Sequence, residues 1–138
     1  MAETPVRAER PDMDIQEEIH DHLTDYPPLS HDRHRVHVEV QNGAVTVSGH
    51  VKTPQTLRYL INKIEQVEGV KSVTNEGLYD DETLRLEVGR LVPVGVFVNT
   101  EYGAVILSGN LAAGAAVESL VQQVAQVPGV HRVLTTFK

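Results

Sequence analysis

Apolar and polar residues alternate near the middle of the chain in a way that predicts a β-hairpin. The valines of segment 36–40 alternate with polar residues, which is typical of a half-buried strand. Asn42 and Gly43 follow at once, and this dipeptide is a strong signal for a tight turn. The alternation then resumes over residues 45–51. We therefore expect two antiparallel strands joined at Asn42-Gly43.

The same pattern returns later in the chain as an internal repeat. Segment 37–73 aligns without gaps on segment 97–133, at an offset of 60 residues. The second copy has alternating runs at 94–98 and 105–111, and we expect a longer turn around 101–103. A period of this length fits two copies of one small domain rather than a solenoid, which needs three or more short repeats.

Apolar stripes at helical spacing follow and precede each hairpin. A threonine and a proline mark the start of a helix at 54–68, and the stripe recurs at 117–127. Weaker stripes at 15–23 and 84–91 stand behind acidic residues, which complement the dipole at a helix start. The residues expected on the buried stripes are Ile15, Ile19 and Leu23; Leu57, Leu60, Ile61, Ile64 and Val67; Leu84, Val88 and Leu91; and Val117, Leu120, Val121, Val124 and Val127.

These elements predict an α+β fold made of two αββαβ modules, each a three-stranded sheet with two helices packed on one face. Apolar residues after each hairpin helix begin the third strand. We expect a flexible N-terminus at 1–11, a first module at 12–79 and a second at 80–138. The copies differ most at 26–34, which is rich in proline and histidine and is expected to be a loop present only in the first copy.

Six glycines recur at matching places and have structural explanations. Gly49 and Gly109 interrupt the second strand of each hairpin, so we expect a bulge there or the close approach of a helix backbone. The others stand at turns and helix ends, where glycine relieves backbone strain. The full set is Gly43, Gly49, Gly69, Gly103, Gly109 and Gly129.

Composition narrows the classes of function. The net charge is −7, and −6 of it lies in residues 1–34, so nucleic-acid binding is not expected. Aromatic residues make up 4% with no tryptophan, which disfavours sugar pockets and stacking platforms. There is no cysteine. The start of the sequence lacks the apolar run of a signal peptide, so we expect a cytoplasmic protein, or a periplasmic or envelope protein if a precursor signal was removed.

The chain resembles the BON domain family. The residues that carry the resemblance are VHVEVQNGAVTVSGHV with GVKSV in the first copy, and VFVNTEYGAVILSGNL with GVHRV in the second. The resemblance covers roughly residues 12–138. It implies binding rather than catalysis, with roles in envelope maintenance, osmotic stress and attachment to phospholipid, and in some members potassium sensing or a place in larger assemblies.

The helix at 54–68 offers a candidate surface for anionic phospholipid or a partner protein. Its exposed side and the preceding residue carry cations that could meet phosphates, with a tyrosine at the interface. The alternative is an ordinary solvated helix face, because Glu65 and Glu68 lie nearby. The candidate residues are Lys52, Arg58, Tyr59, Asn62 and Lys63.

Histidines near the first hairpin raise a weaker possibility of a metal site. His31 and His34 in the expected loop could converge with His37 on the strand, and imidazole suits zinc, copper or nickel. The alternative is a set of exposed histidines. No motif for a nucleophile, a phosphate loop or a zinc protease is present, so neither an enzyme nor a cofactor is expected.

The sequence thus predicts a non-enzymatic binding or scaffolding protein in stress or cell-envelope physiology that acts through protein–protein assembly. We expect a homo-oligomer, because exposed sheet edges need a cover. The helix at 117–127 and the run 94–98 are the candidates for internal or homo-oligomeric contact. Segment 26–34 and the helix at 54–68 are the candidates for an outside partner. A peripheral phospholipid-binding protein and a sensor of potassium or a transition metal are the alternatives.

Overall fold

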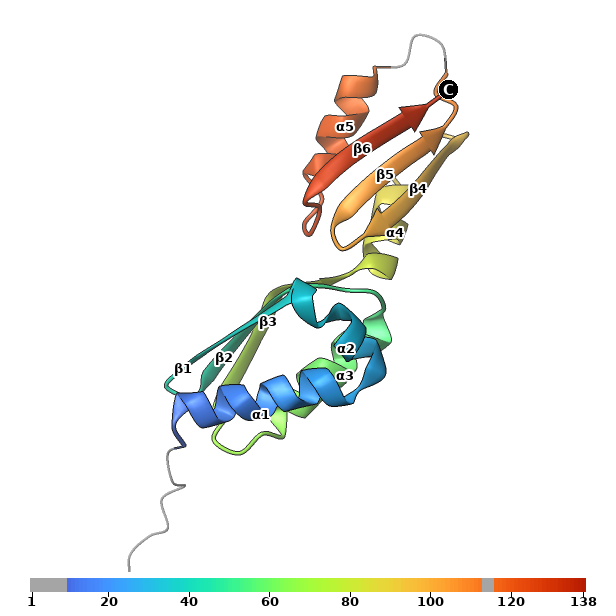
Figure 1. Ribbon diagram of the computed structural model, residues 1–138. Helices are drawn as coiled ribbons and strands as arrows, with labels where there is room; N and C mark the ends of the chain where they lie inside the picture. Colours follow the sequence, from blue (N-terminus) through green and yellow to red (C-terminus); the bar gives the residue numbers. More distant parts are fainter. Residues whose placement is uncertain (1–9, 113–115) are drawn as a thin grey trace, which may run out of the picture.

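The computed structural model describes residues 10–112 and 116–138, and most of the N-terminal segment 1–11 lies outside them. Two modules stack end to end, with α4 next to the first module (Figure 1). The first module contains α1 (Asp12–Asp25), α2 (Pro27–Asp32), the 3-10 turn η1 (Arg33–Arg35), β1 (Val36–Gln41), β2 (Ala44–Val51), α3 (Pro54–Glu65) and β3 (Ser72–Asp80). The second contains α4 (Asp81–Gly89), β4 (Val96–Glu101), β5 (Ala104–Gly109), α5 (Val117–Ala125) and β6 (Arg132–Phe137).

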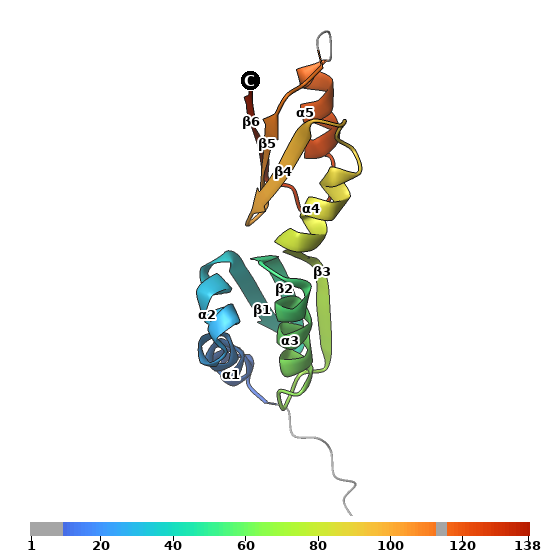
Figure 2. The ribbon, with the colours of Figure 1, turned by 90° about the vertical axis from the view of Figure 1, so that its right-hand side faces the viewer.

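Each module is built on a three-stranded sheet of the same topology. The orders are β1-β2-β3 and β4-β5-β6, with an antiparallel hairpin pair and a parallel third strand. The register also repeats, because Val38 faces Val47 in the first sheet and Val98 faces Leu107 in the second. In the second module, α4 and α5 lie on one side of the sheet (Figure 2). The predicted α+β architecture of two such modules is confirmed.

The helical stripes and the inward side of each sheet form two separate cores. The first gathers residues such as Ile15, Val47 and Leu60, and the second residues such as Leu84 and Leu107, all at most 2% exposed. Two residues of the predicted stripes are exposed. Leu91 is 43% exposed because α4 ends at Gly89, and Val117 is 39% exposed at the first turn of α5.

The turn of the second hairpin is shorter than the sequence suggested. Tyr102 and Gly103 form the same two-residue turn as Asn42 and Gly43, since both central residues of each have positive φ: 46° and 85° in the second, 52° and 81° in the first. Tyrosine rarely adopts this left-handed conformation. The prediction of a longer turn was therefore wrong because a tyrosine here is held in a conformation that asparagine and glycine adopt more easily.

Segment 26–34, expected to be a loop, is instead mostly helical. Pro27 and Pro28 occupy the first turn of α2, where a fixed φ helps and a missing N–H costs nothing. Leu29 is fully buried in the first core and anchors the helix. The first module therefore has a short additional helix that the second lacks.

Gly49 and Gly109 mark close backbone approaches, as expected, but neither neighbour belongs to an α-helix. A side chain at Gly49 would meet the carbonyl oxygen of Arg35, and one at Gly109 would meet that of Gly95. Both neighbours are segments that lead into the first strand of the hairpin.

Candidate functional site: the junction between the modules

The hairpin turn of each module is held by an aspartate at the start of its first helix. In the first module, Asp12 accepts hydrogen bonds from the backbone N–H groups of Asn42 (2.9 Å) and Gly43 (3.0 Å). In the second, Asp81 accepts them from Tyr102 (2.8 Å) and Gly103 (3.3 Å). Two amide donors on one carboxylate fix the turn firmly. The two copies thus share a clamp but present different side chains beyond it.

Tyr102 projects from this turn into a pocket of the first module that we call the tyrosine socket, made of Asp32, Arg35 and Lys52. Its hydroxyl donates to Oδ1 of Asp32 at 2.6 Å, while Oδ2 of Asp32 accepts from the backbone N–H of Lys52 at 3.0 Å. The Asp32 side chain is buried, at 1% exposure. A buried carboxylate with both oxygens hydrogen-bonded is a strong and directional contact between the modules.

The ring of Tyr102 lies near two cations of the socket. The guanidinium carbon of Arg35 is 4.9 Å from the ring centroid and Nζ of Lys52 is 5.8 Å away, both within reach of a cation–π interaction. Burial, the hydrogen bond to Asp32 and the negative charges of Asp32 and Asp81 raise the pKa of Tyr102 well above its usual range, and Arg35 opposes them. The hydroxyl therefore keeps its proton and remains a donor to Asp32.

A second contact joins β2 to the end of the second module. Nε2 of His50 lies 2.7 Å from the carbonyl oxygen of Gly129, so Nε2 carries a proton and donates it. The His50 ring is 5.5 Å from that of His131 and 5.8 Å from that of Tyr79, measured between centroids. His50 is itself buried, at 9% exposure. Both modules therefore contribute rings to this side of the junction.

No loop separates the modules, which restricts their relative motion. β3 ends at Asp80 and α4 begins at Asp81. Asp80 caps α4 by accepting from the N–H of Thr83 at 2.8 Å, and the N–H of Glu82 donates to the carbonyl oxygen of Lys52 at 3.3 Å. The strand passes directly into the helix, and hydrogen bonds cross the boundary. The two modules therefore meet in a defined interface.

Comparison with known families decides the relationship. The family model described as BON domain matches the chain twice, at residues 11–77 and 80–137. The chain belongs to the BON domain family. A search of curated proteins found no match.

Two solved structures share the fold of this tandem BON protein. One is described as CdsD, a structural protein of the type III secretion system of Chlamydia trachomatis, and the other as the C-terminal domain of CdsD. The TM-scores are 0.74 and 0.76, with 16% identity in each case. The match covers 91% of this chain but 62% and 65% of those chains, so this chain spans less than two thirds of their length.

The candidate lipid surface of the first BON module is divided in the structure. Lys52 lies at the junction beside Tyr102, away from the other four residues on α3. Tyr59 stacks on Tyr26 at 3.8 Å, and Nζ of Lys63 lies 5.5 Å from the Tyr59 ring centroid. Arg58 and Asn62 are exposed on the same helix. None of the helices in the described ranges combines the length and apolar character needed to cross a membrane.

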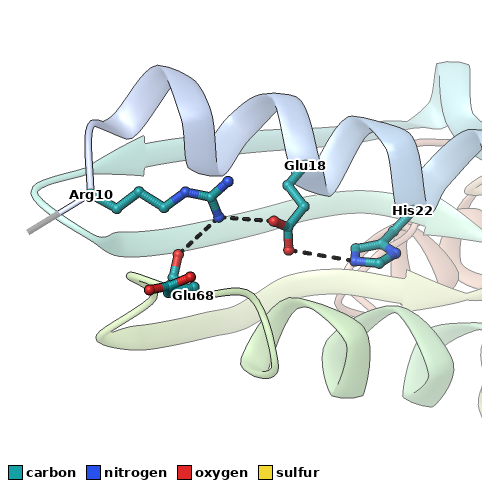
Figure 3. A network of polar contacts seen from close by, with 4 residues as sticks. All are labelled: Arg10, Glu18, His22 and Glu68. Carbon is teal, nitrogen blue, oxygen red and sulfur yellow. Dashed lines mark hydrogen bonds and ion pairs between the residues drawn. The ribbon is translucent and has the colours of Figure 1, made fainter. Parts of the chain in front are cut away.

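The first BON module holds a cluster of charged groups at the start of α1 (Figure 3). The Arg10 guanidinium donates to Oε1 of Glu18 at 2.9 Å and to the carbonyl oxygen of Glu68 at 3.1 Å. Nε2 of His22 lies 3.9 Å from Oε2 of Glu18. These contacts fasten the start of α1 to the segment after α3. The charged groups therefore have a structural role.

The histidines proposed as a weak metal site do not form one. His31 lies in α2, His34 in η1 and His37 in β1, where Nε2 of His37 is 3.2 Å from Oε1 of Glu39. Within residues 10–112 and 116–138, no three histidine, cysteine, aspartate or glutamate side chains are grouped to hold a metal ion. The helical conformation of 27–35 replaces the flexible loop on which that possibility depended.

The open face of the second BON sheet, which we define by Phe97, Ile106 and Leu134, carries these three apolar side chains beside the polar Asn99. Ile106 pairs with Leu134 across β5 and β6, and Phe97 lies diagonally across β4. Phe97 is 69% exposed and Leu134 43% exposed. The corresponding residues of the first sheet, at the same 60-residue offset, are polar: His37, Thr46 and Thr74.

Sequence reasoning missed the residues that build the junction. Asp32 gave no signal, because a carboxylate in a proline- and histidine-rich stretch is usually solvated. Tyr102 did give one: a tyrosine occupies the position where the other copy has asparagine in the turn. Asp80 also fits a helix cap by its spacing before Thr83.

Proposed function

We propose that this protein is a non-enzymatic scaffold that self-associates through the open face of the second sheet. Membership of the BON family supports a binding or scaffolding role. A solved structure of similar fold is described as a structural protein of a secretion system. The observation that carries the proposal is the difference between the two open faces. Only the second has large apolar residues at positions where the first has polar ones.

A second copy is the occupant that this face fits best. Ala104, Ile106 and Leu134 lie together with Phe97 beside them, and the oppositely charged Glu101 and Arg132 flank Ala104 on the neighbouring strands. Two such faces related by a twofold axis would bury their apolar side chains against each other, with Glu101 and Arg132 near the hairpin-turn end. An exposed apolar group of this kind on an otherwise acidic protein is typical of an interaction surface.

The test copies the first module's own residues onto the second. The variant Phe97→His, Ile106→Thr, Leu134→Thr has residues that the same sheet tolerates at the matching positions. Sedimentation velocity over a wide concentration range should show that the unmodified chain associates and that this variant is monomeric. Leu86→Thr is the control, because Leu86 is 57% exposed on α4, away from the face, and should leave association unchanged.

Two outcomes would overturn the proposal. One is an unmodified chain that stays monomeric at every concentration. The other is a triple variant that associates as strongly as the unmodified chain while its circular dichroism shows an intact fold. We place the role in stress or cell-envelope physiology, including osmotic stress, as the family resemblance implies, and growth of a deletion strain under osmotic shock would test that setting.

Attachment to anionic phospholipid through α3 is a second candidate. Arg58 is exposed and Lys63 half-buried on this helix, and each cation near an anionic surface contributes on the order of 1 kcal/mol. Because Tyr59 stacks on Tyr26, the phosphate contacts would depend on the cations alone. Co-sedimentation with phosphatidylglycerol vesicles should be lost in Arg58→Glu with Lys63→Glu and kept in the control Arg85→Glu on α4. Equal binding by all three proteins would contradict it.

A further inference from the structure

A cleft opens beside the junction and receives side chains from both modules. It consists of two pockets of about 380 and 530 Å³ that share Arg35, Tyr102 and His131 in their linings. Arg35 of η1 lines it, His50 lines it from β2, and Tyr102 and His131 line it from the second module. Ser48, Gly49 and Gly77 contribute small residues. A cleft between two modules is a common place for a small ligand.

The polar groups of the cleft are mostly donors and potential cations. Arg35 offers a fixed charge, and His34, His50 and His131 offer imidazoles. Asp32 is the buried carboxylate closest to Tyr102, and both its oxygens already accept hydrogen bonds. The cleft thus gathers hydrogen-bond donors on a chain whose net charge is −7.

Carboxylates also lie around the cleft and limit its charge at neutral pH. Glu39 pairs with His37, which also lines the cleft. Glu101 lines the adjoining part together with Arg132. The positive charges of Arg35 and Arg132 balance the negative charges of Glu39 and Glu101. The protonation of the histidines therefore decides the net charge that a ligand meets.

We propose that this cleft binds a small multivalent oxyanion, of the phosphate or polycarboxylate class. Arg35 can donate two parallel hydrogen bonds to such an anion, and His131 can donate from the facing module. Binding across the junction would hold both modules in the arrangement seen here. This inference does not depend on self-association through the open face of the second sheet.

The histidines make the binding stronger in acid. Nε2 of His50 already donates to the carbonyl oxygen of Gly129, so this hydrogen bond engages one of the two ring nitrogens. His131 is exposed. Histidine side chains in general titrate near pH 6.5. A bound anion therefore favours proton uptake, and affinity rises as the pH falls through this range.

Isothermal titration calorimetry with inorganic pyrophosphate and with citrate tests the proposal. At about pH 6 we expect saturable binding that is at least tenfold tighter than at about pH 8. Titrations in two buffers of different ionisation enthalpy should show net proton uptake. Binding of pyrophosphate alone would assign the phosphate class, and binding of citrate alone the carboxylate class. Failure of both anions to bind at about pH 6 would overturn the proposal.

Point variants test the location of the site. His131→Gln and Arg35→Gln should each weaken binding at least tenfold, and Arg35→Lys should weaken it less because the charge is kept. His31→Gln, in α2 outside the cleft, is the control and should bind as the unmodified chain does. Thermal melts check that each variant is folded. Unchanged affinity in folded His131→Gln and Arg35→Gln would overturn the assignment.

Discussion

The hydroxyl of Tyr102 lies 2.6 Å from Oδ1 of Asp32, and this hydrogen bond joins two modules that have separate cores. Asp32 belongs to α2, the helix that only the first module has, and Tyr102 belongs to the hairpin turn of the second. Each residue therefore stands where the two copies differ. The junction depends on these departures from the repeat.

Tyr102→Phe should lower the free energy of unfolding by about 2 kcal/mol, because it removes a hydrogen bond to a buried carboxylate while keeping the ring. Urea denaturation followed by circular dichroism measures this. Tyr26→Phe is the matched control, since its ring can still stack on Tyr59, and it should change stability by less than about 0.5 kcal/mol. Equal effects of the two substitutions would contradict the role of the Asp32 hydrogen bond.

The raised pKa of Tyr102 predicts a specific loss of stability in alkali. In the unfolded chain a tyrosine ionises near pH 10, whereas burial and Asp32 keep Tyr102 protonated in the folded protein. Its contribution is therefore complete below about pH 10 and declines as the pH rises toward the folded pKa. Urea midpoints of the unmodified chain and of Tyr102→Phe should converge above about pH 10. A constant difference across this range would refute the linkage.

Gly129→Ala should damage the junction more than Gly69→Ala damages the first module. Both glycines have positive φ, 96° and 94°, so the backbone cost of alanine is about 1 kcal/mol at each. The new Cβ at 129 would lie 2.6 Å from Cγ of the Tyr79 ring, whereas at 69 it would lie 2.6 Å from Cβ of Arg10. Arg10 stands outside the helices and strands, before α1, whereas Tyr79 lies within β3, so we expect the chain at Arg10 to shift more easily.

The NMR signals of the junction histidines distinguish Gly129→Ala from Gly69→Ala. In the NMR spectrum, the imidazole resonances of His50 and His131 should shift in Gly129→Ala and stay in place in Gly69→Ala, since Gly129 accepts the His50 hydrogen bond. Unfolding by urea should also show a larger loss for Gly129→Ala, by about 1 kcal/mol or more. A larger loss of stability for Gly69→Ala would contradict this prediction, because it would show that the Tyr79 ring accommodates the new Cβ.

Asp81→Asn should destabilise the second module by about 1 to 3 kcal/mol, because an amide cannot accept from both turn N–H groups without turning its own NH₂ toward one of them. Asp12→Asn should cost less, since Asp12 is only partly buried and Asp81 is 7% exposed. Asp14→Asn, on the exposed side of α1, is the control. Thermal denaturation of the three variants gives the order directly.

Local patterns predicted the repeated fold because they are encoded in neighbouring residues. Alternation at 36–40, the Asn42-Gly43 turn and the stripe over 57–67 each correspond to the expected element. The helix α2 was missed because its stability comes from the burial of Leu29, which is a tertiary effect that the prolines conceal.

The candidate site could not be predicted to the same extent. The junction brings together residues as far apart as Asp32 and Tyr102, or His50 and Gly129, and no local pattern encodes such pairs. The sequence predicted basic residues on the outer side of α3, but it gave no sign that the ring of Tyr59 stacks on Tyr26. Pairing between modules depends on how they dock, and docking is decided by side chains outside the repeated pattern.

The first module supplies the socket of the joint and the second supplies the tyrosine, so the two copies are not interchangeable. End-to-end contact between like units normally permits an open filament, because each unit offers the surface that the next one needs. Here the free turn at the far end of the first module carries Asn42 in place of a tyrosine, and the second module has no equivalent of α2 to receive one. A third unit of the same kind would find neither half of this joint, so the contact between Tyr102 and Asp32 cannot repeat along a row of such modules.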